Sequence, residues 1–132
     1  MGTRSRVAVM HGDVYKSVYC HYDGYLDGVG AGLQDYTTQE AVEALIAPGD
    51  RSSLDGPYYK DRGETGVAPT EYSTFEEFYE AVEGCWGEYY YVFKDGVWYC
   101  GDTYERTGIS GKLVPYAEAV EIRAAEREAE DA

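Results

Sequence analysis

The sequence is poor in positively charged residues. It holds 11 Lys and Arg against 25 Asp and Glu, for a formal net charge of −14 over 132 residues. Nucleic acids and anionic membranes are bound largely by Lys and Arg, which neutralise phosphate. We therefore expect neither as a direct partner, and a protein with a basic surface fits the charge better. The charge also has an ordinary explanation, because an acidic surface keeps a small protein soluble.

Cysteine is scarce, and long apolar runs are missing. Cys20, Cys85 and Cys100 are an odd number and form no Cys-x-x-Cys pair, which favours a reducing compartment over a disulfide framework. No run approaches the roughly 20 apolar residues that span a bilayer, and the first residues lack a secretory apolar segment. The expected location is the cytoplasm.

The common motifs of catalysis are absent as well, including the P-loop, Gly-x-Gly-x-x-Gly and Gly-x-Ser-x-Gly. Cys20, His21 and Asp23 have the side-chain types of a nucleophilic triad. Neighbours on a strand point to opposite faces, however, and no basic cluster is evident to lower the thiol pKa. Four residues have side chains that can bind zinc: Cys20, His21, Cys85 and Cys100. Their spacing matches no paired-ligand pattern of zinc sites. We expect no catalytic residue, metal or cofactor, and keep an enzyme that uses Cys20 as an alternative.

Aromatic residues are abundant, with 15 Tyr among them and an overall hydrophobic fraction of 44%. This content is enough to bury a core, so the chain is not expected to be disordered. Its length suits a single domain over residues 1–132.

The central segment 88–102 carries the strongest structural signal. Two aromatic and β-branched runs flank Asp95-Gly96, which predicts a β-hairpin with a two-residue loop. The predicted pairs are Lys94 with Val97, Phe93 with Trp98, Val92 with Tyr99, and Tyr91 with Cys100. Both faces of this hairpin are apolar or aromatic, so we place it at the centre of the core.

A second hairpin is predicted near the N-terminus, where residues 5–11 and 14–19 flank Gly12-Asp13. Its alternation places four valines on one face: Val7, Val9, Val14 and Val18. The opposite face, with Tyr15 and Ser17, is expected to meet solvent in part.

Four helices are predicted from apolar periodicity and capping signals. They are a short helix over 26–33 that Asp23-Gly24 could cap, one that begins at Thr37, one that begins at Ser73-Thr74, and one from Tyr116 to about Glu130. Residues 50–70 are expected to form a long loop, and residues 125–132 a frayed tail. The predicted fold class is α+β, a mostly antiparallel sheet built from both hairpins and packed on one side against two to four helices.

Negative charge and tyrosine gather around the third predicted helix. Glu76, Glu77, Glu80, Glu83 and Glu88 lie beside three tyrosines, Tyr72, Tyr89 and Tyr90. A solvated helix face is the ordinary account of such a group. The functional account is a patch of regularly placed negative charge and aromatic tips, complementary to a basic groove.

Three stretches carry a resemblance to a known group of proteins. They are Arg4–Val9, the run Ser17–Tyr25 with Val29-Gly30 after it, and the later Lys94–Tyr99. The chain resembles small bacteriophage-encoded accessory proteins, in which a Ser-Val-Tyr-Cys-His-Trp-Asp-Gly-Tyr run follows a first strand. Tyr22 stands here at the place of the Trp. The resemblance assigns no residue a role. It implies a phage source and a class that often inhibits host defences or host enzymes, with the host cytoplasm as the location.

We therefore expect a phage-encoded inhibitory protein that binds a basic host protein without catalysis, with nucleic-acid mimicry as one mode. The expected binding residues are Glu76, Glu77, Glu80, Glu83, Glu88, Tyr72 and Tyr90. The first alternative is a protein that binds and sequesters a signalling nucleotide. Its aromatic rings would stack on the nucleobase, and the Lys and Arg residues of the long loop would hold the phosphates. Its expected residues are Arg51, Lys60, Arg62, His21, Tyr22 and Trp98. The oligomeric state stays open, a homodimer included.

Overall fold

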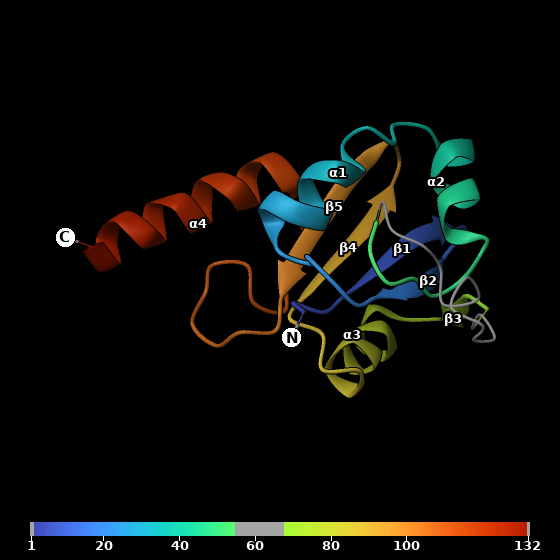
Figure 1. Ribbon diagram of the computed structural model, residues 1–132, viewed down its shortest axis with the longest axis horizontal. Helices are drawn as coiled ribbons and strands as arrows, with labels where there is room; N and C mark the ends of the chain where they lie inside the picture. The colour runs from blue at the N-terminus through green and yellow to red at the C-terminus, as the bar shows by residue number, and fades with distance from the viewer. Residues whose placement is uncertain (1, 55–67, 132) are drawn as a thin grey trace.

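The computed structural model describes residues 2–54 and 68–131. The elements in chain order are β1 Ser5–His11, β2 Val14–Cys20, the π-helical turn η1 Leu26–Gly30, α1 Ala31–Leu33, α2 Gln39–Ile46, β3 Thr70–Tyr72, α3 Phe75–Gly84, β4 Tyr89–Lys94, β5 Val97–Asp102, β6 Val114–Pro115 and α4 Tyr116–Asp131. The strands form one six-stranded sheet in the order β3-β2-β1-β4-β5-β6 (Figure 1). The predicted α+β class is confirmed.

The two predicted hairpins meet through a parallel pair of strands at the centre of the sheet. β1 and β4 run side by side from Ser5 opposite Tyr89 to Val9 opposite Phe93, and the other strand pairs are antiparallel. Parallel neighbours need a long crossover connection, which the chain supplies between β2 and β4. The sheet is therefore mixed and mostly antiparallel.

The register of the central hairpin is confirmed residue by residue. Lys94 lies opposite Val97, Phe93 opposite Trp98, and the pairing continues to Tyr89 opposite Asp102. Asp95 and Gly96 both have positive φ angles, of 51° and 81°, as the tight two-residue hairpin loop requires.

The N-terminal hairpin also has its predicted alternation. Val7 lies opposite Val18 and His11 opposite Val14, which puts the four valines on one face. The expectation that the other face meets solvent is wrong for Ser17, which is fully buried. Its hydroxyl accepts a hydrogen bond from Nε of Arg6 at 3.1 Å, and α3 packs on this face of the sheet.

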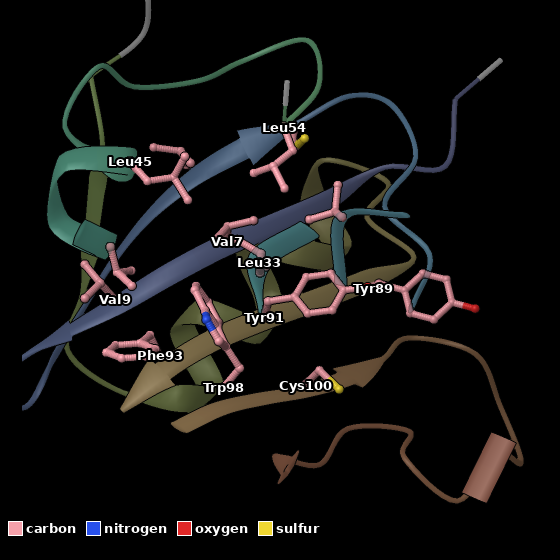
Figure 2. Close-up of a cluster of buried hydrophobic side chains, with 14 of the residues drawn as sticks. Val7, Val9, Leu33, Leu45, Leu54, Tyr89, Tyr91, Phe93, Trp98 and Cys100 are labelled. Carbon is pink, nitrogen blue, oxygen red and sulfur yellow. The ribbon is translucent and has the colours of Figure 1, made fainter. Parts of the chain in front are cut away.

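Helices cover both faces of the sheet, so the expected one-sided arrangement is wrong. On one face, η1, α1, α2 and α4 close a cluster that includes Val7, Tyr91 and Phe93, and Figure 2 shows these side chains pointing to the same side. On the other face, Ala8, Tyr90 and Val92 form a second cluster with residues of α3. Both faces of β1 and β4 are apolar, and each therefore needs its own cover.

Local details of the helices differ from the sequence-based expectations. The 26–33 segment starts as a π-helical turn, and its N-cap residue Tyr25 makes no side-chain capping bond, so Asp23-Gly24 does not cap it. The cap of α2 is Thr38, one residue after the predicted Thr37, and Thr38 Oγ1 accepts the Ala41 amide at 3.1 Å. Thr74 caps α3 in the same way, through the Glu77 amide at 3.1 Å.

The last helix begins at Tyr116, as predicted, and continues to Asp131. Ala119 is its buried contact with the core, and the C-terminal part of α4 points away from the sheet (Figure 1). Fraying of residues 125–132 stays a prediction. No helix in the described part of the chain has the length and apolar character needed to cross a membrane.

Replacing Phe78 with Ala is expected to lower the free energy of unfolding by about 3–5 kcal/mol, the usual cost of truncating a buried Phe. Phe78 is fully buried and stacks on Tyr15 with ring centroids 5.4 Å apart. Chemical denaturation measures the loss, and Glu77→Ala on the exposed side of α3 should change stability by no more than about 0.5 kcal/mol. A loss below about 1 kcal/mol for Phe78→Ala would show that α3 does not depend on this contact.

Candidate functional site

A surface groove follows α3. It has a volume of about 640 Å³ and is lined by Phe75, Glu76, Tyr79, Glu80, Glu83 and Gly111. We call it the acidic groove. Half of its lining residues are glutamates, and all three come from the set that the sequence singled out.

The packing of α3 fixes which side chains line the groove. Phe78 and Val82 are the buried residues of this helix, and they anchor it on the sheet cluster of Ala8, Tyr90 and Val92. With 3.6 residues per turn, burying one stripe turns the glutamates toward solvent. α3 lies on this face of the sheet apart from the other helices (Figure 1), so no neighbouring helix covers them.

The three groove glutamates repel one another. Glu76, Glu80 and Glu83 are spaced i, i+4 and i+7, so their carboxylates share one side of the helix within about 11 Å along its axis. Like charges at this spacing each cost a few tenths of a kcal/mol. Glu76 is favoured by the positive end of the helix dipole, but Glu83 lies near the negative end, where an acid is unfavourable. The fold does not gain from this arrangement of charge.

None of these glutamates forms an ion pair within the described ranges 2–54 and 68–131. The ion pairs there are His11 with Glu43 at 2.8 Å and Arg123 with Glu126 at 3.0 Å. Neither pair involves α3. The groove therefore presents glutamates that form no ion pair with any residue of these two ranges.

Tyr79 gives the groove an aromatic wall. Its ring meets that of Tyr90 edge to face at a centroid distance of 5.7 Å. Burial raises the pKa of Tyr79, and the negative charges of Glu83 and Asp102 raise it further. The phenol therefore stays neutral at physiological pH and keeps its proton for donation.

The loop that carries Gly111 forms the opposite wall, and the buried Asp102 holds this loop in place. Oδ1 of Asp102 accepts the Thr107 hydroxyl at 2.8 Å and the Tyr104 amide at 3.2 Å, while the Gly111 amide donates to the Asp102 carbonyl at 3.0 Å. Burial raises the pKa of Asp102. The hydroxyl of Tyr90 donates to the carbonyl of Lys112, which ties the loop to the sheet beneath α3.

The remaining predicted binding residues lie outside the groove. Glu77 is exposed on α3 but does not line the groove. Glu88 accepts the Tyr104 hydroxyl at 2.6 Å, and the half-buried Tyr72 lies 5.8 Å from the guanidinium carbon of Arg6. The expectation that Tyr90 contacts a partner is wrong. Its side chain is 0% exposed, because α3 covers it.

The residues expected for a nucleotide site do not form one in the described structure. Arg51 is buried, and its guanidinium donates to the carbonyls of Leu45, Ser53 and Leu54 at 3.2, 3.0 and 2.8 Å. Arg51 thus supports the segment after α2, and the expectation that it binds a phosphate is wrong. Lys60 and Arg62 lie outside the described residues.

Trp98 was also expected to stack on a base, yet it is 5% exposed. Its Nε1 donates to the Tyr36 carbonyl at 2.9 Å. The adjacent pocket has a volume of about 240 Å³, and neither Lys nor Arg is among its lining residues. Tyr22 is partly exposed, and His21 meets its ring edge-on at 4.5 Å. The pocket beside Trp98 therefore offers no cation for a phosphate among its described lining residues.

Cys20 is buried in the core with 0% exposure. Burial raises the pKa of its thiol to about 11, so the nucleophilic thiolate is scarce at neutral pH. The neighbouring His21 directs Nδ1 to the Tyr19 hydroxyl at 2.6 Å. Cys20 and His21 therefore do not form the pair that a cysteine nucleophile needs. Within the described residues, no cluster of three or more His, Cys, Asp or Glu side chains is placed to hold a metal ion.

One strongly exposed residue was not identified from the sequence. Trp86, just after α3, is 78% exposed and has a φ angle of +62°. The Trp86 amide donates to the Glu83 carbonyl at 3.0 Å and the Gly87 amide to the Val82 carbonyl at 2.7 Å, which is the Schellman pattern of helix termination. Glycine usually takes the left-handed position in this pattern. A Trp between two glycines, Gly84 and Gly87, was the only sequence signal.

The chain was compared with family models, curated proteins and solved structures, and none of them matches it.

Replacing Arg51 with Met is expected to reduce the free energy of unfolding by about 2–4 kcal/mol, because three buried carbonyls lose their donors. Urea denaturation measures the change, and the matched Arg127→Met on the exposed part of α4 should stay within about 0.5 kcal/mol of the parent. Unchanged stability in Arg51→Met, together with loss of a nucleotide-induced rise in Tm, would restore the nucleotide-binding alternative.

The native protein is expected to show one rapidly reacting thiol toward a disulfide reagent at pH 8. Burial raises the pKa of Cys20 to about 11 and that of Cys100 to about 12, whereas Cys85 is only half-buried. Stopped-flow absorbance counts the thiols, and Cys85→Ser should remove the rapid phase. A rapid phase that survives in Cys85→Ser and disappears in Cys85→Ser with Cys20→Ser would support an activated Cys20.

Proposed function

We propose that this chain is a stoichiometric, non-catalytic binding protein that docks the acidic groove of α3 on a basic surface of a host protein. The observation that carries the proposal is the exposed stripe of Glu76, Glu80 and Glu83 along the acidic groove, which forms no ion pair with the described residues. A host surface that ordinarily holds nucleic acid is the leading target, because Lys and Arg gather on such surfaces.

Charge complementarity supports this mode of action. A negative groove next to a basic partner accelerates encounter and rejects acidic competitors. Aromatic residues add binding energy where they are buried against the partner, and Phe75 and Tyr79 line the groove together with the glutamates. The resemblance to small phage proteins suggests the setting, an inhibitor of a host defence or of a host enzyme.

Competition with DNA tests this proposal directly. A bacterial lysate is loaded on DNA-cellulose, and the pure chain is added at constant ionic strength. The wild-type chain is expected to release a subset of the bound proteins, which mass spectrometry identifies. The variant with Glu76→Lys, Glu80→Lys and Glu83→Lys should need at least about tenfold more protein for the same release, because its groove is now positive.

The control variant carries Glu118→Lys, Glu121→Lys and Glu128→Lys on α4. These three glutamates are also exposed, so the change in net charge is the same while the groove stays intact. The control should release proteins nearly as well as the wild type, and circular dichroism establishes that both variants fold. Equal weakening of both variants would assign the effect to net charge alone. Failure of the wild type to release any protein would refute the proposed function.

A further inference from the structure

Trp86 combines two features that the fold does not need. Its side chain is 78% exposed, although Trp is among the side chains with the largest apolar area to bury. Its φ angle of +62° is unfavourable for any residue with a Cβ, and Gly or Asn would hold the same turn at lower cost. Single exposed apolar residues are common on protein surfaces, but they seldom also occupy a strained position.

The flanking glycines make the choice of Trp more specific. A Cβ on Gly87 would lie 2.7 Å from a side-chain carbon of Val82 and 2.8 Å from the Val82 carbonyl oxygen, so position 87 has no room for a side chain. Position 86 is held by two backbone hydrogen bonds, from Trp86 to Glu83 and from Gly87 to Val82. The turn therefore fixes the backbone from which the indole projects. A rigid aromatic side chain loses little entropy when it is buried by a partner.

We propose that Trp86 is a pre-positioned anchor that inserts into an apolar pocket of the partner protein, and that this pocket is bordered by Lys or Arg. The basic border is argued from charge, because Glu80 and Glu83 are exposed in the last turns of α3 and Glu88 follows two residues after Trp86. The inference rests on the proposed function and names the contact that gives it affinity. Trp is the residue type most enriched among binding hot spots.

The surroundings of Trp86 favour a protein over a membrane. An exposed Trp can also enter the interfacial region of a bilayer, but bilayer anchors of this kind are flanked by Lys and Arg. Here the neighbours in sequence are Glu83 and Glu88, which anionic lipids repel. A second copy of this chain is disfavoured by the same argument, since its net charge is −14.

Fluorine NMR of the chain labelled with 5-fluorotryptophan tests the proposal without knowledge of the partner. The chain has two Trp residues, and the buried Trp98 serves as an internal reference. In the free protein, the Trp86 resonance should shift between H2O and D2O, and the Trp98 resonance should not. The probe is the nuclease-treated fraction of a bacterial lysate that binds DNA-cellulose. Its addition should abolish the solvent shift of Trp86 alone.

Two substitutions separate binding from a structural role of Trp86. Trp86→Gly and Trp86→Ala should both weaken binding to this fraction by about 30-fold or more, which corresponds to about 2 kcal/mol. Trp86→Gly should nevertheless have a Tm above that of Trp86→Ala, because Gly removes the strain at positive φ. A purely structural role for Trp86 predicts that Trp86→Gly binds as well as the wild type, and that result would overturn the inference.

The outcomes distinguish this inference from the proposed function. If both resonances broaden while Trp86 keeps its solvent shift, a complex forms without the anchor, and only the inference fails. If the variant with Glu76→Lys, Glu80→Lys and Glu83→Lys retains the full Trp86 response, the anchoring role of Trp86 is supported and the binding role of the acidic groove is refuted. If neither Trp resonance changes, both the anchoring role of Trp86 and the proposed function are refuted. If phosphatidylglycerol vesicles alone abolish the solvent shift of Trp86, its partner is a membrane and the inference is overturned. If a higher concentration of the chain alone abolishes it, its partner is a second copy of the chain, and the inference is again overturned.

Discussion

The parallel contact between β1 and β4 is the constraint on which the rest of the structure depends. It joins the two hairpins through strand segments that are buried, with pairs from Ser5 opposite Tyr89 to Val9 opposite Phe93. A central pair of this kind is stable in water only if both faces are covered. The chain meets this need with η1, α1, α2 and α4 on one face and with α3 on the other. The isolation of α3, and hence the exposure of its outer face, follows from the topology of the sheet.

Local sequence signals determined the hairpins well because each depends on neighbouring residues. The Asp95-Gly96 turn and the alternation around it were enough to assign the four pairs from Lys94 with Val97 to Tyr91 with Cys100. The parallel pairing was not predictable in this way, because it joins residues more than 80 positions apart and has no turn of its own. The expectation that Ser17 meets solvent failed for the same reason, since its cover comes from distant segments.

The candidate site was predictable in its charge but not in its geometry. Helical periodicity identified the glutamates of α3, and the anchoring of Phe78 exposes them. Periodicity could not show that three of them line one groove with Gly111, because the loop that carries Gly111 is distant from α3 in the sequence and meets it only in the folded molecule. Tyr90 was misassigned because its hydroxyl suggested exposure, whereas in the structure that hydroxyl serves a buried bond to Lys112.

Two departures from local rules lie close together, on α3 and just after its end. The stripe of glutamates opposes the preferences of helix α3 for unlike charges and for a cation near its C-terminus. Trp86, at the end of that helix, opposes the preference for glycine at positive φ. Stable proteins depart from such rules mainly where function requires it. Elsewhere the caps of Thr38 and Thr74, the hairpin turns and the two core clusters agree with the fold. The glutamate stripe of α3 and the exposed Trp86 beside it therefore support this helix as the part of the molecule that meets its partner.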